Sequence, residues 1–165
     1  MPVGQTGDTD FSEYFEARVQ RFRRLAFGMC GDWHSAEDLV QTTFIQLYRR
    51  WRKVRPDTVD AYARRILLNA FLTGRRKRGK ELVTSSPPER AAPPGHDSHE
   101  RIDLERVLSD LTPRQRAMVV LSFLEDLSVT EVASLLGVAE GTVKSQTARG
   151  VEALRTALPS PTSKE

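Results

Sequence analysis

Residues 128–154 read SVTEVASLLGVAEGTVKSQTARGVEAL, and this stretch decides the fold of the C-terminal part of the chain. Ser128 and Glu131 have the spacing of a capping box, in which each side chain satisfies a free backbone N–H at the start of a helix. The helix that follows is short, about 129–136, because Gly137 can adopt the left-handed conformation that ends it. The stretch therefore predicts two helices joined by a tight turn.

The second helix of this pair, expected to run from the 139–142 region to about Leu158, has two contrasting faces. Its inward stripe recurs at three- and four-residue steps and consists of Val143, Thr147, Val151, Leu154 and Leu158. Its opposite face is small and basic, with Gly141, Lys144, Ser145, Ala148, Arg149 and Glu152. A helix with such a face can enter the major groove of DNA and reach bases or phosphates. The pattern favours a DNA-binding helix-turn-helix over a helical hairpin with solvated charges.

Two further helices and a linker are expected before this pair. Thr112 and Pro113 form a favourable N-cap and first-turn pair, which predicts a helix that continues to about Leu124. Residues 99–111 are predicted to form one helix before it. Residues 81–99, ELVTSSPPERAAPPGHDSH, contain two Pro-Pro pairs and no apolar periodicity. This composition indicates an extended linker, with a long surface loop as the alternative.

The N-terminal part also shows only helical periodicity. Apolar stripes predict one helix ended by Gly31, a second from the 32–35 region to before Pro56, and a third from the 57–60 region to Gly74 or into the basic run after it. The sequence thus predicts an all-α protein of two small helical domains joined by a Pro-rich linker. The expected parts are a disordered N-terminus at 1–10, a helical bundle at 11–80, the linker at 81–99, a helix-turn-helix domain at 100–158 and a disordered tail at 159–165.

Positive charge is concentrated in one segment. The 165 residues include 25 Lys and Arg against 22 Asp and Glu, a net charge of +3. Between residues 49 and 80, twelve basic residues stand against only Asp57 and Asp60, a local balance of +10. Such a segment suggests a polyanionic partner, with a solvated helix face as the alternative.

Several classes of protein are excluded by composition. No apolar run approaches the roughly 20 residues of a membrane-spanning helix, and the start MPVGQTGDTD lacks the features of a secretory signal. The single cysteine, Cys30, cannot form an internal disulfide or a thiolate zinc site, and we expect it to be a small buried residue. The three histidines are scattered, and no P-loop, metal-ligand cluster or Ser/His/Asp grouping is present. We therefore expect a cytoplasmic, nucleoid-associated protein that is not an enzyme and needs no cofactor or metal.

Three stretches resemble bacterial RNA polymerase sigma factors of the extracytoplasmic-function class, and more narrowly the actinobacterial sigma-E type. GDWHSAEDLVQTTFIQLYRRW at 31–51 resembles the core-binding helix of sigma region 2, and AYARRILLNAFLTGRRKR at 61–78 resembles the promoter-melting helix after it. LTPRQRAMVVLSFLEDLSVTEVASLLGVAEGTVKSQTARGVEALR at 111–155 resembles region 4. The resemblance implies an alternative sigma factor that binds core RNA polymerase, recognises −10 and −35 promoter elements and melts the −10 region.

The resemblance also implies protein partners. They are core RNA polymerase, through the coiled coil and flap of its large subunits, and an anti-sigma factor, which the family commonly uses. The positions carried over for polymerase docking are Glu37, Asp38, Leu39, Gln41 and Phe44. For Leu39 and Phe44, burial in the bundle core is an equally good interpretation.

Promoter DNA, both double- and single-stranded, is the other implied partner. The positions carried over for the −10 element are Trp51, Tyr62, Arg65, Asn69, Arg75, Arg76, Lys77 and Arg78. The two aromatic rings could stack on unpaired bases or pack in the core, and the four clustered basic residues would hold phosphates. The positions for the −35 element are Lys144, Ser145, Ala148 and Arg149 in the groove, Thr142 and Arg114 at phosphates, and Gln146, where relatives often have arginine.

Two other functions compete with this interpretation. An autonomous helix-turn-helix regulator would share residues 128–154 and would bind specific duplex DNA without polymerase. A membrane-binding role for the basic segment is disfavoured, because no long apolar face lies opposite its arginines.

Overall fold

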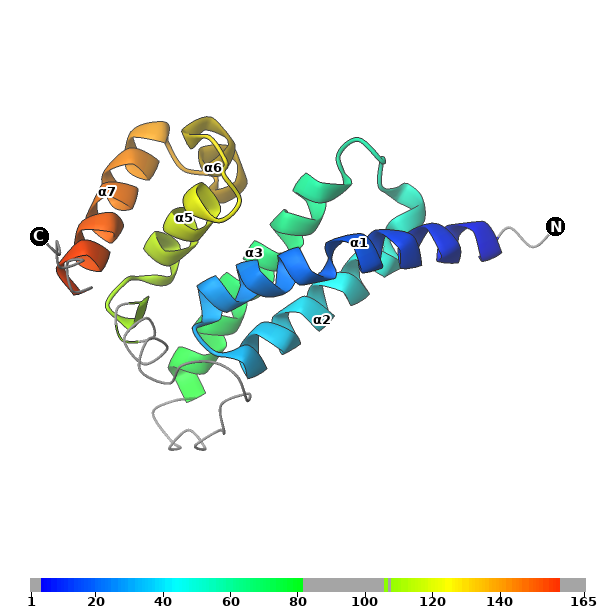
Figure 1. Cartoon of the computed structure of the whole chain (residues 1–165), viewed down its shortest axis with the longest axis horizontal. Helices are drawn as coiled ribbons and strands as arrows, with labels where there is room; N and C mark the ends of the chain where they lie inside the picture. The colour runs from blue at the N-terminus through cyan, green and yellow to red at the C-terminus, as the bar shows by residue number, and fades with distance from the viewer. Residues whose placement is uncertain (1–3, 82–105, 107, 158–165) are drawn as a thin grey trace, which may run out of the picture. The chain divides into compact units, whose positions relative to one another are not determined.

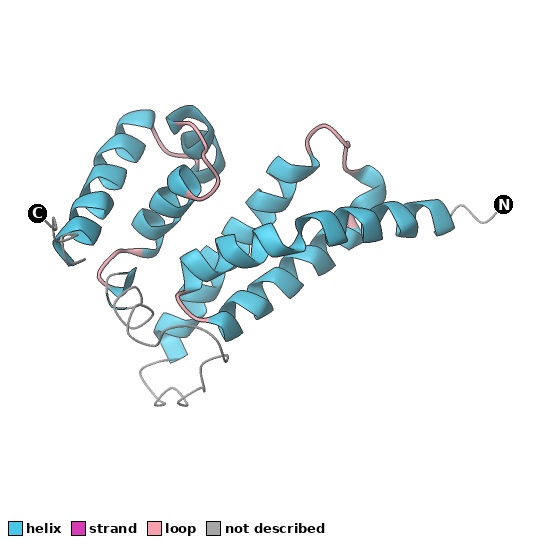
Figure 2. Cartoon of the chain, viewed as in Figure 1, coloured by secondary structure: helices cyan, strands magenta, loops and turns pink. Residues whose placement is uncertain are grey.

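The computed structural model describes residues 4–81, 106 and 108–157, and these contain helices but no strand (Figure 2). Side chains are described for residues 7–74, 106 and 108–156. The chain divides into two compact units between residues 85 and 86, a point inside the predicted linker. The predicted all-α fold class is confirmed.

The first unit is a bundle with α2 in the middle. Helix α1 spans Gly4–Cys30, α2 spans Trp33–Arg49 and α3 spans Val59–Glu81, with a short 3-10 turn, η1, at Trp51–Lys53. Both α1 and α3 pack along α2 (Figure 1). The buried apolar side chains at this packing include Phe22, Leu25, Met29, Leu39, Phe44, Leu47, Leu67, Leu68 and Phe71. Their removal from water is what holds the three helices together.

The turn between α1 and α2 is built as the sequence predicts. Gly31 has a φ of +79°, the left-handed conformation that ends α1. Asp32 then caps α2, because its Oδ1 accepts a hydrogen bond from the backbone N–H of Ser35 at 2.7 Å. The chain can therefore reverse within two residues, and α2 returns along α1 (Figure 1).

The prediction that residues 1–10 are disordered is wrong from Gly4 onward, where α1 begins. The Tyr48 hydroxyl donates a hydrogen bond to Asp8 Oδ1 at 2.8 Å, and the rings of Phe11 and Tyr48 lie 5.0 Å apart. These contacts hold the early turns of α1 against α2. The polar composition of the segment does not reveal them, since the partner lies 40 residues away in sequence.

Helix α3 continues through the basic run and ends at Glu81, so Gly74 does not stop it. The side chains of residues 75–81 lie outside the described residues, as do the predicted tail at 159–165 and nearly all of the predicted linker. Of the helix predicted over 99–111, only Arg106, Leu108 and Ser109 are described as helical.

In the described part of the second unit, from residue 108 to residue 157, α5, α6 and α7 pack around a small core. Helix α5 spans Pro113–Phe123, α6 spans Val129–Leu136 and α7 spans Glu140–Ala157. Both α5 and α6 pack against α7. The buried apolar side chains of this unit include Leu108, Leu111, Ala117, Met118, Val119, Val120, Leu121, Val132, Ala133 and Val143.

Side-chain caps fix where these helices start and stop. The predicted capping box of Ser128 and Glu131 is present in both directions, and Gly137 ends α6 with a φ of +65°. Thr112 caps α5 as predicted, and Gln115 completes a second capping box there. The helix-turn-helix is therefore specified by local hydrogen bonds as well as by its core.

The buried stripe of α7 is centred on Val143 and on Gly150, a residue that the apolar pattern does not mark. The other predicted stripe residues are half-buried; they are Thr147, Val151 and Leu154, whereas Leu158 lies outside the described residues. A Cβ placed on Gly150 would lie 2.5 Å from Cγ2 of Val119, which is buried on α5. Glycine at this position therefore allows α5 and α7 to cross closely.

We expect Gly150→Ala to destabilise the second unit by about 1–3 kcal/mol, because the added methyl overpacks a contact with a stiff, buried valine. The measurement is denaturant unfolding followed by far-UV circular dichroism. Trp33 and Trp51, the two tryptophans of the chain, lie in the first unit and report its unfolding separately by fluorescence.

Gly141→Ala is the matched control on the same helix, since a Cβ there has nothing within 4 Å. We expect it to leave stability unchanged or to raise it slightly, as alanine is the better helix former. A Gly150→Ala protein as stable as this control would contradict the close crossing.

Candidate functional site

The outer face of α2 presents a row of exposed side chains. Asp38, Gln41, Thr42 and Ile45 follow at three- and four-residue steps, so they share one face of the helix, here called the α2 row. Ile45 is 53% exposed and Tyr48, one turn further along, is 50% exposed. Exposed apolar side chains gathered among polar ones are typical of a contact surface for another macromolecule.

Sequence reasoning missed Ile45 and Tyr48. The available signal was their spacing, because Ile45 lies four residues after Gln41 and seven after Asp38, both of which were predicted for docking. Apolar residues are more often buried than exposed, so residue type alone does not reveal that these two lie on the surface.

The acidic groups of α2 differ in their partners. Glu37 forms an ion pair with Arg23 of α1, so it helps to fasten α1 to α2. Asp38 lies in the α2 row, and its Oδ2 is 3.5 Å from Nε2 of His34 one turn earlier. Asp38 is therefore the carboxylate that the row presents to a partner.

Two of the predicted docking residues belong to the core. Phe44 is 4% exposed, and its ring lies between 4.8 and 6.4 Å from the rings of Phe15, Phe22, Phe11 and Tyr14 on α1. Leu39 is 8% exposed. Both side chains are nearly buried in the bundle, as the core interpretation expects, and their direct contact with polymerase stays a prediction.

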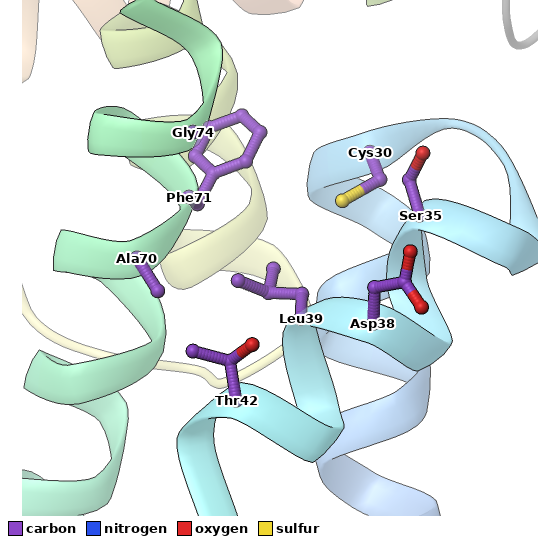
Figure 3. Close-up of a pocket in the computed structure, with 8 residues that line it drawn as sticks. All are labelled: Cys30, Ser35, Asp38, Leu39, Thr42, Ala70, Phe71 and Gly74. Atoms are coloured by element: carbon purple, nitrogen blue, oxygen red, sulfur yellow. The ribbon is translucent and has the colours of Figure 1, made fainter. Parts of the chain in front are cut away.

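Leu39 does reach a shallow pocket between α2 and α3 (Figure 3). The pocket is lined by Cys30, Ser35, Asp38, Leu39, Thr42, Ala70, Phe71 and Gly74. Figure 3 shows Leu39 and Thr42 on α2 opposite Ala70 on α3, with the Cys30 side chain near Ser35. Asp38 and Thr42 line the pocket and also belong to the α2 row, so the two features are continuous. Cys30 is half-buried, somewhat more exposed than predicted.

Helix α3 carries its predicted residues on one strip. Arg65 and Asn69 are exposed and Tyr62 is half-buried, at spacings that place them on one side of the helix. The Asn69 side chain faces solvent, although the helix around it is rich in Leu and Ile. The side chains of Arg75, Arg76, Lys77 and Arg78 lie outside the described residues.

Trp51 packs within the first unit. Its ring centroid lies 5.4 Å from that of Phe11 and 5.4 Å from that of Tyr14, and the residue is half-buried. Of the two interpretations offered by the sequence, the packing interpretation is the one that the structure shows.

A polar cluster joins α1 to the start of α3. The Tyr14 hydroxyl donates a hydrogen bond to Asp60 Oδ1 at 2.7 Å. Arg18 donates from Nε to Oδ1 at 3.1 Å and from Nη2 to Oδ2 at 3.3 Å, so it holds both oxygens of the same carboxylate. We call these three residues the Asp60 cluster; sequence reasoning did not identify it.

The contacts within the Asp60 cluster shift the pKa values of Tyr14 and Asp60. Burial, and then the hydrogen bond to Asp60, raise the pKa of Tyr14. Partial burial acts to raise the pKa of Asp60, but the hydrogen bonds from Arg18 and Tyr14 outweigh it and leave that pKa below its usual value. The carboxylate is therefore ionised throughout the neutral range.

In the second unit, α7 presents the predicted outward face. Lys144, Ser145, Ala148 and Arg149 are all exposed, and so is Thr142. The Ser145 hydroxyl donates to the Thr142 carbonyl oxygen at 3.2 Å within the helix. Arg114 is exposed in the first turn of α5. These side chains are available to a nucleic acid, as the sequence predicts.

Gln146 departs from this pattern. It is half-buried, and its Oε1 accepts a hydrogen bond from Nε2 of Gln115 on α5. Since Gln115 also completes the capping box with Thr112, one amide joins the start of α5 to the middle of α7. Gln146, named for the −35 element because relatives often have arginine there, therefore turns its side chain toward α5, unlike the four residues predicted for the groove.

Two negative findings apply to the described residues. Within residues 4–81, 106 and 108–157, no group of three or more His, Cys, Asp or Glu is placed to hold a metal ion. Over the same residues, no helix is long and apolar enough to cross a membrane.

Comparison with known proteins matches both units. A family model for sigma-70 region 2 matches residues 14–81, and one for sigma-70 region 4 matches residues 101–154. The chain is 36% identical to the ECF RNA polymerase sigma factor SigE of Mycolicibacterium smegmatis, over 91% of this chain and 63% of that protein. It is also 36% identical to the RNA polymerase sigma-E factor of Streptomyces coelicolor, over 90% of this chain and 86% of that protein.

Solved structures show a similar fold. The sigma factor RpoE of Bartonella quintana, solved in complex with the anti-sigma factor NepR, matches with a TM-score of 0.72 and 26% identity over 90% of this chain and 96% of that chain. CnrH, solved in complex with the cytosolic domain of CnrY, matches with a TM-score of 0.66 over 90% of this chain and 87% of that chain. At 20% identity, the CnrH match shows likeness of fold alone.

A double-mutant cycle on Gln115 and Gln146 tests the contact between α5 and α7. We expect each change to alanine to destabilise the second unit, and the two losses to be less than additive by about 1 kcal/mol, because both remove the same hydrogen bond. Unfolding followed by circular dichroism gives the four free energies. Full additivity would show that the two side chains do not interact.

Acid unfolding tests the carboxylate of Asp60. Because the pKa of Asp60 is lowered on folding, its stabilising effect is complete above the unfolded value of about 3.9 and is lost as pH falls through the folded value. The difference in Tm between wild type and Asp60→Asn, followed by tryptophan fluorescence, should be largest near neutral pH and shrink below about pH 4. A difference that stays constant down to pH 3 would contradict this account.

Proposed function

The chain belongs to the extracytoplasmic-function class of RNA polymerase sigma factors, and we propose that its three exposed surfaces divide the work of an alternative sigma factor. As such a factor, it binds core RNA polymerase and promoter DNA and directs promoter-specific transcription. The observation that carries the proposal is that both matched regions keep helix faces exposed: the α2 row and the α3 strip in region 2, and the outer face of α7 in region 4.

The α2 row is the proposed docking surface for core polymerase. It combines the exposed Ile45 with the carboxylate of Asp38 and the amide of Gln41. This combination suits the coiled coil of the largest subunit, on which region 2 of the family docks, where arginine beside apolar side chains would be complementary. Glu37 supports the surface indirectly through its ion pair with α1.

The strip on α3 is the proposed surface for the −10 element. Arg65 and Asn69 are exposed and available to a melted strand, and the half-buried Tyr62 lies on the same side of the helix. The positions of Arg75, Arg76, Lys77 and Arg78 on the same helix support a role in holding phosphates of the adjoining duplex. Sigma factors are in general not enzymes. This surface would help to melt the −10 region by capturing its unpaired bases.

The outer face of α7 is the proposed reader of the −35 element. Lys144 and Arg149 can donate to guanine, Ser145 can donate or accept, and Ala148 can contact a thymine methyl. Thr142 and Arg114 can contact phosphates and so fix the position of α7 in the groove. All of these side chains are exposed on the second unit.

The same surfaces would be the targets of an anti-sigma factor. The RpoE structure was solved in complex with one, which supports an equivalent partner here. An inhibitor that covers the α2 row would exclude core polymerase by direct competition. The sigma factor acts in the cytoplasm with RNA polymerase, and association with the nucleoid would follow from its binding to promoter DNA.

Run-off transcription with core polymerase tests the function as a whole. The templates are promoter regions of the source genome, including the region upstream of this protein's own gene. Discrete start sites that appear only when the protein is added are expected. Specific binding to a duplex without polymerase, and no initiation with it, would instead support the autonomous regulator.

Ile45→Glu tests the docking surface. We expect it to weaken binding to core polymerase by at least about tenfold, because it places a charge in the apolar part of the interface. Gln46→Glu adds the same charge to an exposed position about 100° round the helix and should bind normally. Equal binding by the two variants in a fluorescence titration would contradict the assignment of the α2 row.

Changes on α7 test base recognition. We expect Arg149→Ala or Lys144→Ala to weaken recognition of the −35 element by about 1–3 kcal/mol and to relax base preference where the side chain contacts a base. Gln146→Ala should leave the base preference unchanged, since that side chain faces α5. Transcription from a library randomised at −35 measures both effects, and a changed preference in Gln146→Ala would refute the placement.

A further inference from the structure

The segment that joins α2 to α3 is basic and exposed. Arg52, Lys53 and Arg55 all face solvent between the end of α2 and the start of α3. The segment leads directly into the α3 strip with Tyr62, Arg65 and Asn69, the proposed surface for the −10 element. The position of this segment relative to the α3 strip therefore decides whether one unpaired DNA strand can contact both the segment and the strip.

The hydrogen bonds formed within this segment are local. Lys53 N–H donates to the Arg50 carbonyl at 2.9 Å, Val54 N–H to the Trp51 carbonyl at 3.3 Å, and Thr58 N–H to the Arg55 carbonyl at 3.1 Å. Such short-range bonds shape the segment but do not attach it to the rest of the bundle. Contacts with α1 are found at its two ends.

Both ends of the segment meet at Tyr14 of α1. At the first end, the Trp51 ring lies 5.4 Å from the Tyr14 ring. At the second end, the Tyr14 hydroxyl donates to Asp60 at 2.7 Å, in the first turn of α3. Arg18 holds the same carboxylate through two hydrogen bonds, and its guanidinium carbon lies 5.8 Å from the centre of the Tyr14 ring. One residue of α1 thus contacts both anchor points.

The Asp60 cluster lies at the rim of the unit and not in its core. The Arg18 and Asp60 side chains are 37% and 38% exposed. Ion pairs of this exposure contribute little to global stability. Arg18 holds the Asp60 carboxylate through two hydrogen bonds and Tyr14 through a third. Together they fix the direction of that carboxylate, and therefore the direction of the first turn of α3.

We propose that Tyr14, Arg18 and Asp60 are positioning residues that hold the basic segment at 52–58 in the arrangement that captures the unpaired strand of the −10 element. The proposal rests on the proposed sigma function. A segment that is already ordered loses less conformational entropy when it binds, so the captured state is reached more readily. The cluster acts through the segment and does not itself touch the bases.

The test uses holoenzyme assembled from core polymerase and the full chain, on a promoter mapped with the wild type. Asp60→Asn removes the charge that Arg18 holds, and Tyr14→Phe removes one hydrogen bond while keeping the ring against Trp51. The matched control is Thr43→Ala, which removes a buried hydrogen bond of 2.7 Å to the Leu39 carbonyl, away from the segment. The readouts are binding of a single-stranded −10 oligonucleotide, binding of core polymerase, and Tm from tryptophan fluorescence.

We expect Asp60→Asn to weaken binding of the single strand by about tenfold. Displacement of a positioned group can reduce its effect by up to about a hundredfold, and here Trp51 still holds the first end of the segment against α1. Core binding should stay within about twofold, because the α2 row is untouched. The direction of the effect is diagnostic. Removal of a negative charge would by itself strengthen binding to DNA, so weaker binding cannot come from net charge.

Each outcome decides the proposal. Weaker capture in Asp60→Asn and Tyr14→Phe, and normal capture in Thr43→Ala at equal or greater loss of Tm, supports a positioning role. Unchanged capture in both cluster variants, or equal loss in all three, would overturn it and leave a merely structural contact. Wild-type holoenzyme that directs no start site would overturn the proposed function itself, and this inference with it.

Discussion

The structure of the first unit depends on one constraint, which is that α2 must bury its side chains against two neighbours at once. Its buried residues are Ser35, Ala36, Leu39, Val40, Thr43, Phe44 and Leu47, and they face α1 and α3. The remaining face is exposed to solvent, and the α2 row lies on it. The docking surface is therefore fixed by the packing behind it. The same packing encloses the Phe44 ring among aromatic rings of α1.

In the second unit, too, packing fixes which face of a helix is exposed. A close crossing at Gly150 and a buried Val143 set α7 against α5, and the amide contact between Gln115 and Gln146 fixes its rotation. Lys144 and Arg149 then face solvent. In each unit, packing on the buried face of one helix, α2 or α7, fixes the orientation of its exposed face. The side chains on that face need not rearrange to meet a large partner, which lowers the entropic cost of binding.

Local signals in the sequence predicted much of this architecture. Gly31, Gly137 and the Ser128 capping box act within a few residues, so helix boundaries near them could be predicted, and the exposed residues of α7 followed from periodicity. Tertiary contacts could not be predicted in the same way. The early start of α1 depends on Tyr48, the inward turn of Gln146 depends on Gln115, and Asp60 depends on Tyr14 and Arg18, which lie far away in sequence. Phe44 and Ile45 are neighbours of similar character, and their opposite exposure follows from the helical spacing, which places Phe44 with Val40 and Leu47 and Ile45 with Gln41.

The central claim is that one chain reads two promoter elements while bound to polymerase. The most direct measurement is a combined footprint on a mapped promoter, with nuclease protection at −35 and permanganate reactivity of unpaired thymines at −10. The account predicts that protection and reactivity both appear only when the protein and core polymerase are present together. Protection at −35 by the protein alone, with no reactive thymines when polymerase is added, would contradict it.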